Sequence, residues 1–145
     1  MNTSKKISIF LVDDDAMYLK LLENELSEKP EYVLKTFSSG ERCVESLSET
    51  PDVIVLDYYL NGIERSALNG LETLKRIKLA NPEIPVIMLS AQDRIEVAVN
   101  CMKLQAFEYI VKSETAIARL HSAISTMIHY KKMEKTLNWY MEQLW

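Results

Sequence analysis

Short runs of hydrophobic residues alternate along the chain with longer segments in which hydrophobic residues recur every three or four positions. The short runs are rich in β-branched residues and stop at polar or turn-forming positions, a pattern that predicts buried strands. The predicted strands span residues 7–12, 32–37, 53–56, 85–89 and 107–111. The segments that follow them have the period of amphipathic helices. The pattern therefore predicts five strands that alternate with five helices.

Residues that cap helices mark the expected helix starts. A Ser, Asn or Asp followed three positions later by Glu can satisfy the free N–H groups of a first helical turn. The expected capping residues are Asp15, Ser38 with Glu41, Asn69 with Glu72, Asp93 with Glu96, and Ser113. The first four helices are expected to end by Pro30, at about Glu49, before Pro82 and at about Leu104.

Strands that are nearly continuous in apolar residues are typical of a parallel sheet with helices on both faces. Right-handed crossovers then favour a doubly wound, flavodoxin-like α/β fold with strand order 2-1-3-4-5. A length of 145 residues suits one domain with a single core. We therefore expect a five-stranded α/β domain with an extended C-terminal helix.

Polar residues follow the ends of four predicted strands. They are Asp13, Asp14 and Asp15 after the first strand, Asp57 after the third, Ser90 after the fourth and Lys112 after the fifth. Because parallel strands end at the same edge of a sheet, where ligands bind in open α/β folds, these side chains should converge on one crevice. Taken singly, each has a simpler interpretation as a cap, a turn residue or a solvated charge. Asp15 is expected to be only a cap.

The charges in this crevice favour a metal ion. Asp13, Asp14 and Asp57 bring three negative charges together, and like charges in a partly dry pocket destabilise one another. Lys112 offsets one of them. A hard divalent cation with oxygen ligands, Mg²⁺, would offset the rest, and a metal with a lysine is an arrangement that neutralises a transferring phosphoryl group. Asp57, alone at the end of its strand, is then a candidate nucleophile.

Composition narrows the partners and the compartment. The net charge is −4, so no basic field favours direct binding of nucleic acid or of a membrane surface. The apolar stretch near the N-terminus ends within about six residues, too short for a secretory signal or a membrane span. Cys43 and Cys101 lie far apart in helical patterns and are expected to be reduced core thiols. A cytoplasmic protein is expected.

Four segments in order resemble the receiver domain of bacterial two-component response regulators. They are FLVDDD at 10–15, VIVLD at 53–57, VIMLSA at 86–91 and YIVK at 109–112. Each motif alone is weak, whereas all four in this order and spacing are specific. The resemblance covers residues 5–129, and we expect residues 1–129 to form the receiver domain.

The resemblance implies that Asp57 accepts a phosphoryl group from the phosphohistidine of a histidine kinase or phosphotransfer protein. It also implies that Asp14 and Asp57 bind Mg²⁺ directly, together with the backbone carbonyl of Tyr59. Asp13 would bind the ion through water. The chain would promote its own phosphorylation and slow dephosphorylation, without turning over an external metabolite.

By the same resemblance, Ser90 and Lys112 would contact the phosphoryl oxygens. Tyr109 lies three residues before Lys112, where the family has its switch aromatic. On phosphorylation Ser90 would move toward the phosphoryl group and Tyr109 would turn inward. This would repack the surface of the fourth helix, fifth strand and fifth helix and bias a two-state equilibrium.

The sequence departs from the family pattern in two places. Ser113 follows Lys112 where receivers usually have a proline after a cis bond, and a non-proline cis bond costs about 3 kcal/mol. The bond is therefore expected to be trans, or cis under strain. The loop at 58–69 is longer than usual, with Asn61 near the usual proline position and the helix-opening glycine at Gly70. A long loop at this edge is expected to be functional or mobile.

Hydrophobic or small residues continue through the last helix at alternating spacings of four and three. They are Ala116, Leu120, Ala123, Met127, Tyr130, Leu137, Met141 and Leu144, with Glu134 as the one break. This is a heptad seam. We expect residues 130–145 to form a helical extension that exposes Trp139, Tyr140, Leu144 and Trp145. The extension would form a homodimer with a second copy, or lead into an output domain beyond residue 145. A frayed tail or a fold-back onto the domain is the alternative.

Two other classes of protein compete with the signalling switch. An enzyme of the haloacid-dehalogenase type would carry Asp-x-Asp on its first strand with the nucleophile there, whereas this chain has its lone aspartate, Asp57, on the third. A pseudo-receiver, an interaction module independent of phosphorylation, would be expected to lack an acidic residue, Ser90 or Lys112. All of these residues are present.

Overall fold

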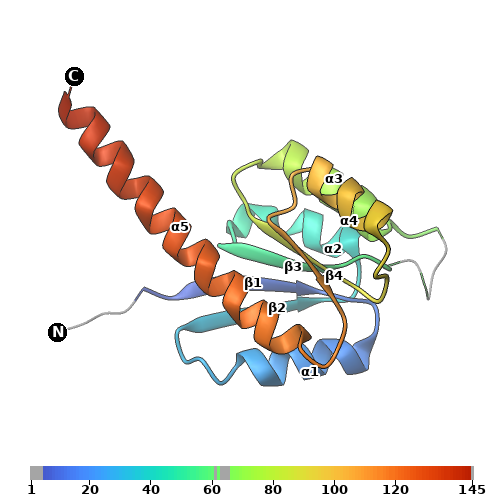
Figure 1. The fold of residues 1–145 in the computed structure, drawn as a ribbon. Coiled ribbons are helices and arrows are strands. Elements are labelled where there is room, and N and C mark those ends of the chain that lie inside the picture. Colours follow the sequence, from blue (N-terminus) through green and yellow to red (C-terminus); the bar gives the residue numbers. More distant parts are fainter. Residues whose placement is uncertain (1–4, 61, 63–65, 145) are drawn as a thin grey trace.

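Figure 1 shows the computed structural model of the chain, which describes residues 5–60, 62 and 66–144. Within these residues, five parallel strands form one sheet in the order β2-β1-β3-β4-β5, as predicted. The strands are β1 (Ile7–Val12), β2 (Tyr32–Phe37), β3 (Val53–Asp57), β4 (Val86–Ser90) and β5 (Glu108–Val111). The helices are α1 (Ala16–Leu26), α2 (Gly40–Glu45), α3 (Gly70–Ala80), α4 (Ile95–Lys103) and α5 (Ala116–Leu144), with a short 3₁₀ helix η1 (Leu47–Glu49) after α2. Each strand bound lies within one residue of its prediction.

Helices cover both faces of the sheet (Figure 1). On one face, α2, α3 and α4 cover a core built from Phe10, Ile54, Leu56, Met88 and their neighbours. On the other, α1 and α5 cover a second core that includes the alternate residues of the same strands, such as Ile9, Val55 and Leu89. Successive strand residues point to opposite faces, so apolar residues are required at nearly every strand position. This explains the continuous apolar runs. Cys43 and Cys101 are free, buried thiols in the first core, as predicted.

The strand register aligns the carboxyl ends of β1, β3, β4 and β5. Val12 at the end of β1 pairs with Leu56, the residue before Asp57. Asp57 pairs with Leu89, the residue before Ser90. Ser90 pairs with Val111, the residue before Lys112. The residues that end or follow these strands therefore lie side by side at the carboxyl edge of the sheet.

Two predicted helix starts are confirmed. Asp15 is the N-cap of α1, and its carboxylate accepts hydrogen bonds from the backbone N–H groups of Met17 and Tyr18. Asn69 and Glu72 form a reciprocal capping box at the start of α3. In both cases the side chain satisfies N–H groups that have no partner within the helix.

The predicted capping pair of α2 is wrong by one residue. The N-cap is Ser39, not Ser38, and α2 ends at Glu45 rather than Glu49, with η1 completing the segment. Glu41 does not return to the cap, because its carboxylate accepts a hydrogen bond from the backbone N–H of Leu68 at 3.1 Å. A tertiary contact to the loop before α3 has replaced the local one.

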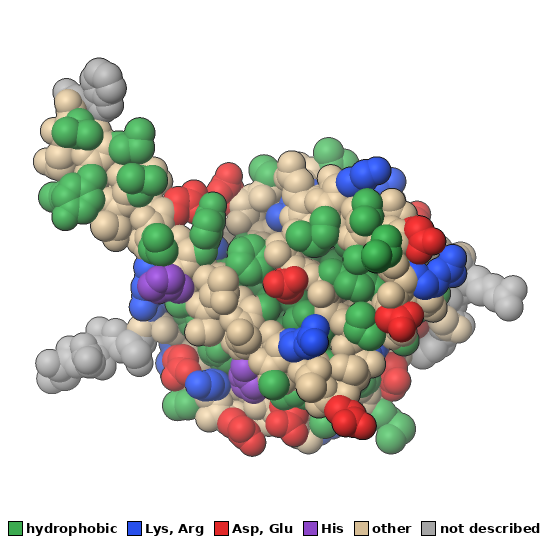
Figure 2. Space-filling model, viewed as in Figure 1, with side chains coloured by type: hydrophobic (Ala, Val, Ile, Leu, Met, Phe, Trp, Pro, Cys, Tyr) green, Lys and Arg blue, Asp and Glu red, His purple; other side chains and the backbone are tan. Residues whose placement is uncertain are grey.

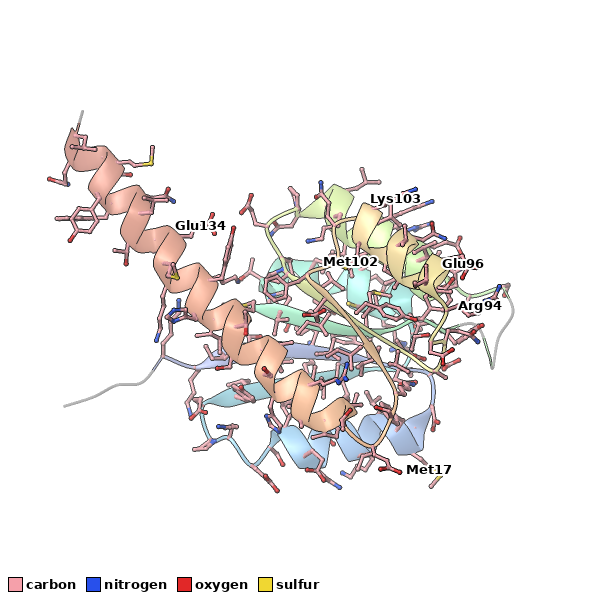
Figure 3. The ribbon with its side chains drawn as sticks, in the orientation of Figure 1. Met17, Arg94, Glu96, Met102, Lys103 and Glu134 are labelled. Carbon is pink, nitrogen blue, oxygen red and sulfur yellow. The ribbon has the colours of Figure 1, made fainter. Side chains whose placement is uncertain are left out.

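The predicted pair Asp93 and Glu96 does not cap α4. The helix begins at Ile95 with Arg94 as its N-cap, without a side-chain capping bond. The Glu96 carboxylate instead lies 4.0 Å from the Arg94 guanidinium, and Figure 3 labels both residues at the start of α4. The preceding loop is held at Gln92, whose side chain and backbone bond to Tyr59 and Tyr109. We attribute the later start of α4 to these bonds.

The last helix begins later than the Ser113 prediction and continues far beyond the sheet. The Ser113 hydroxyl accepts the N–H of Thr115, and α5 starts at Ala116. Its buried residues end at Met127, and the Lys131 ammonium donates to the backbone carbonyl of Asp52 at 2.9 Å. All residues from 132 to 144 are exposed. Figure 1 shows this part of α5 projecting from the body, which excludes a fold-back in this structure.

The projecting part of α5 carries exposed hydrophobic side chains, visible as a cluster at its end in Figure 2. They are Met133, Leu137, Trp139, Tyr140, Met141 and Leu144, with Tyr130 just before them. Trp145 lies outside the described residues. Glu134, the break in the seam, lies near the point where α5 leaves the body (Figure 3). None of the helices within the described ranges is long and apolar enough to cross a bilayer.

Candidate functional site

Three carboxylates meet at the carboxyl edge of the sheet. Asp13 and Asp57 are 1% and 4% exposed, and Asp14 is partly exposed. Carboxylate oxygens of the three residues lie within 4.8 Å of one another. Asp13 and Asp14 follow β1 directly, and Asp57 is the last residue of β3, so the pairing of these two central strands brings the acids together.

Lys112 reaches this cluster from the end of β5. Its ammonium lies 3.1 Å from Asp13 Oδ2 and 3.0 Å from Asp57 Oδ1. Its backbone N–H donates to the carbonyl of Ser90 at 2.7 Å, which fixes the residue against β4. The bond from Lys112 to Ser113 is trans, since the described part of the chain contains no cis peptide bond. The predicted convergence of Lys112 on Asp57 is therefore present with a trans bond.

The pKa values of the site reflect burial first and the neighbouring charges second. Burial raises the pKa of Asp57 to about 7, the charge of Asp13 adds to the rise, and Lys112 opposes it. Burial also raises the pKa of Asp13, despite hydrogen bonds from the Asp15 N–H and from Lys112. Burial alone would lower the pKa of Lys112, but Asp57 and Asp13 outweigh it and raise that pKa. The single positive charge of Lys112 does not neutralise the three carboxylates.

The donors fit a hard divalent cation. Three carboxylates supply oxygen ligands, two of them buried, and the excess negative charge would be neutralised by a cation with two positive charges. Both oxygens of Asp13 already accept hydrogen bonds, one from the Asp15 N–H and one from Lys112. Asp14 Oδ2 accepts the backbone N–H of Gly62 at 3.1 Å. The cluster can therefore hold a metal ion, and both oxygens of Asp13 are already engaged by protein groups.

Ser90 and Tyr109 come from the neighbouring strands β4 and β5 and are linked through Gln92. Ser90 is fully buried at the end of β4, and its hydroxyl accepts the N–H of Gln92 at 3.0 Å. The half-buried Tyr109 packs against the core that α4 covers, and its hydroxyl donates to the carbonyl of Gln92. The Gln92 amide donates to the hydroxyl of Tyr59 at 3.1 Å. Tyr109 thus lies inward, and a hydrogen-bonded connection runs from it to the loop after Asp57.

The loop after Asp57 is anchored at both ends. Gly70 donates its N–H to the carbonyl of Tyr58, and a side chain on Gly70 would lie within 2.4–2.6 Å of the backbone of Asp57 and Tyr58. Glu41 holds Leu68 from the side of α2. Asn61, near the position of the family proline, lies outside the described residues.

The structure thus brings Asp13, Asp14, Asp57 and Lys112 together, whereas Ser90 and Tyr109 make their hydrogen bonds to Gln92. Two contacts were not predicted. The ring of Tyr18, in the first turn of α1, lies 4.1 Å from the Lys112 ammonium, and Glu41 clamps the long loop. The position of Tyr18 just after the acidic triplet places it near the site, but its partner comes from the other end of the chain. Sequence spacing offered no signal for this pair.

Comparison with known proteins identifies relatives of the whole folded domain. Residues 9–125 match the family described as the response regulator receiver domain. The DNA-binding transcriptional regulator NtrC of Escherichia coli K12 is 33% identical over 134 residues, which cover 90% of this chain and 27% of NtrC. The chain therefore spans about a quarter of the length of that relative.

Solved structures show the same architecture. NtrX from Brucella abortus, in complex with ADP, superposes with a TM-score of 0.79 at 26% identity, over 92% of this chain and 29% of that one. The signal receiver domain of a LuxO repressor protein from Vibrio parahaemolyticus also gives a TM-score of 0.79, at 20% identity, over 91% of this chain and 97% of that one. The second likeness supports the fold alone.

Proposed function

The chain belongs to the response regulator receiver domain family, and from this premise we propose that it is a phosphorylation-controlled switch whose phosphoacceptor is Asp57. The observation that carries the proposal is the buried Asp57 carboxylate, held 3.0 Å from the Lys112 ammonium and grouped with Asp13 and Asp14. A lone nucleophilic carboxylate beside a cation is suited to accept a phosphoryl group.

In the proposed reaction, an oxygen of Asp57 attacks the phosphorus of a phosphohistidine on a histidine kinase or phosphotransfer protein. The phosphorus–nitrogen bond breaks, the imidazole leaves with a proton, and an acyl phosphate forms on Asp57. Lys112 neutralises charge on the phosphoryl oxygens, and the Ser90 hydroxyl donates a hydrogen bond to one of them. Hydrolysis of the acyl phosphate later resets the switch, so the chain does not act on an external metabolite.

Mg²⁺ is the proposed cofactor. Asp14, Asp57 and the backbone carbonyl of Tyr59 would hold it directly, and the engagement of both Asp13 oxygens supports a role for Asp13 through water. When bound, the ion supplies positive charge that stabilises the transferring phosphoryl group. The donor set and the raised pKa of Asp57 support this assignment.

The proposed readout of phosphorylation is the surface of α4, β5 and α5. A phosphoryl group on Asp57 would draw the Ser90 hydroxyl, which shares Gln92 with Tyr109 through hydrogen bonds. The inward position of Tyr109 would then be favoured over an outward one. Because β5 pairs with β4 at Ser90 and Val111, a shift at one strand end is transmitted to the other.

The proposal is tested by incubating the protein with acetyl phosphate and Mg²⁺ and measuring its intact mass and the modified position. We expect one phosphoryl group on Asp57 that is lost over time, and no adduct on the Asp57→Asn variant. Asp15→Asn is the matched control, because Asp15 caps α1 and asparagine caps helices equally well. This variant should be phosphorylated like the wild type.

Other outcomes would point to the competing classes. A protein that binds Mg²⁺ but takes up no phosphoryl group would be a pseudo-receiver. Repeated turnover of a phosphate ester would indicate a phosphatase of the haloacid-dehalogenase type. Either result would refute the proposed switch.

We also propose that residues 130–145 are a separate pairing segment that joins two copies of the chain, with residues 1–129 as the receiver domain. The described part beyond Lys131 is helical but wholly exposed, and a helix of this length is only marginally stable without a partner. Its apolar residues repeat at spacings of four and three, so a second copy offers a matching seam.

A further inference from the structure

The Lys112 ammonium has an aromatic ring on one side of it. Its nitrogen lies 4.1 Å from the centre of the Tyr18 ring, well inside the roughly 6 Å within which a cation is attracted to a ring face. Tyr18 lies in the first turn of α1 and packs against the core formed by α1 and α5. The ring is therefore supported from behind by the domain core, while its face meets the site.

The electrostatic surroundings of Tyr18 agree with this placement. Burial raises the pKa of the Tyr18 hydroxyl, and its further influences are the charges of Lys112, Asp13 and Asp57. The tyrosine thus belongs to the same charged cluster as the proposed phosphoacceptor, although it contributes no charge of its own at neutral pH.

Lys112 needs positioning because a lysine side chain is long and flexible, with four carbons between its backbone and its charge. Its backbone is fixed by the bond to Ser90, but the next residue, Ser113, is exposed and its hydroxyl turns to Thr115. The ammonium is drawn toward Asp13 and Asp57 by charge. Among the described residues, the Tyr18 ring is the group that supports it by an aromatic contact.

We propose that Tyr18 is a positioning residue whose ring holds the Lys112 ammonium against Asp57 for phosphoryl transfer. The inference rests on the proposed function of Asp57. Ring and carboxylates together confine the ammonium, and the Lys112 side chain is only 19% exposed, so less rotamer freedom is lost when the phosphoryl group arrives. Tyr18 contacts the cation rather than the reacting atoms, so its effect passes through Lys112.

The test compares initial rates of Asp57 phosphorylation by acetyl phosphate, with saturating Mg²⁺, followed by intact mass. Tyr18→Leu removes the ring but keeps a hydrophobic side chain on the core, and we expect the rate to fall about three- to tenfold. Tyr18→Phe keeps a ring face and should retain the rate to within about threefold. Tyr32→Leu is the matched control, since Tyr32 is a partly buried tyrosine on the same core, on β2. Its rate should match the wild type.

A double-mutant comparison separates positioning from a general structural effect. In a Lys112→Ala background, Tyr18→Leu should change the remaining rate by less than about twofold, because the cation it positions is absent. Thermal unfolding of every variant shows whether it is folded. The inference is overturned if Tyr18→Leu matches the wild type, if Tyr18→Phe is as slow as Tyr18→Leu, or if Tyr18→Leu slows both backgrounds equally.

The same experiment distinguishes this inference from the function on which it rests. A wild-type protein without an adduct overturns both. A wild-type protein that is phosphorylated on Asp57, with a Tyr18→Leu variant that is phosphorylated equally fast, overturns only the role of Tyr18. An effect of Tyr18→Leu confined to transfer from a histidine kinase would mark Tyr18 as a partner contact and would likewise overturn the positioning role.

Discussion

At the scale of single residues, the buried carboxylate of Asp57 lowers the stability of the folded protein. Asp57 is 4% exposed and lies close to two other carboxylates, with Lys112 as the nearby cation that bonds to it. Burying a charge without full compensation destabilises the folded state. The raised pKa of Asp57 expresses this cost, because burial disfavours the ionised carboxylate relative to the unfolded chain. The same burial that positions the proposed phosphoacceptor therefore lowers the free energy of unfolding.

This cost predicts how stability depends on pH in the absence of metal. The pKa of Asp57 rises from 3.8 to about 7 on folding, so between these values the unfolded chain releases a proton that the folded protein keeps. The contribution of Asp57 is therefore fully present below pH 3.8 and is lost as the pH rises toward 7. In urea unfolding with EDTA, Asp57→Asn should become more stable than the wild type as the pH rises from 4 to 8, by a few kcal/mol at roughly 1.4 kcal/mol per pH unit.

Mg²⁺ should reduce the difference between the two proteins. A cation favours the ionised carboxylates, so at pH 8 it should stabilise the wild type more than Asp57→Asn. The comparison between the two proteins cancels the titration of groups that do not interact with Asp57, whereas the pKa values of Asp13 and Lys112 respond to its removal. Equal stability of the wild type and Asp57→Asn at pH 8 without metal would contradict the assigned burial of charge.

The residues of the site were predictable only in part from the sequence. Asp13, Asp57, Ser90 and Lys112 follow apolar strands, and parallel strands end at a common edge, so their convergence follows from strand pairing. The ring of Tyr18 under Lys112 does not follow, because α1 and the end of β5 come together only through packing of the whole domain. Side-chain pairs between distant elements have no local pattern that would reveal them.

At the scale of elements, the start of α3 is packed directly against the end of β3. A side chain on Gly70 would approach backbone atoms of Asp57 and Tyr58 within 2.4–2.6 Å, and backbone cannot swing aside as a side chain can. The Gly70 N–H also donates to the Tyr58 carbonyl. This close approach couples the position of α3 to that of the phosphoacceptor.

Gly70→Ala should therefore cost about 1–3 kcal/mol in the free energy of unfolding and should slow phosphorylation of Asp57. The helix start has to move away, and the end of β3 moves with it. Gly62→Ala is the matched control for stability alone, because among the described residues a side chain there meets Asp14 Oδ2 at the ordinary distance of 3.4 Å. Urea unfolding and acetyl phosphate labelling measure both effects, and a Gly70→Ala protein as stable as the control would show that the contact is easily relieved.

Helix starts show where sequence patterns were sufficient and where they were not. Asn69 with Glu72 was correct because both side chains act within α3. Ser38 with Glu41 was wrong because Glu41 bonds to Leu68 in another segment. A capping motif depends on only two or three residues, so a single tertiary hydrogen bond to one of them can change where the helix begins. Strands were predicted to within one residue because their apolar runs stop at polar or turn-forming residues, and the two central strands β3 and β4 are buried at every position.

At the scale of the whole molecule, α5 joins two parts with different environments. Up to Met127 it covers the sheet, and Lys131 makes a last hydrogen bond to the carbonyl of Asp52. Beyond that, the described residues 132–144 expose large hydrophobic side chains to solvent. The spacing of apolar residues predicted the seam. It could not predict the partner, because periodicity identifies an apolar face of a helix but not what covers that face. A second copy is the proposed partner.

If two copies pair through this segment, the average molecular mass in solution should rise with protein concentration. Sedimentation equilibrium should show a monomer–dimer equilibrium, and Leu137→Lys should raise its dissociation constant at least about tenfold, because a charge would replace a hydrophobic side chain in the seam. Thr136→Lys, one position away and off the seam, should leave the mass unchanged. Glu134→Leu should tighten association by completing the repeat. A chain that stays monomeric at every concentration, with its far-ultraviolet helical signal unaltered by Leu137→Lys, would refute pairing through this segment.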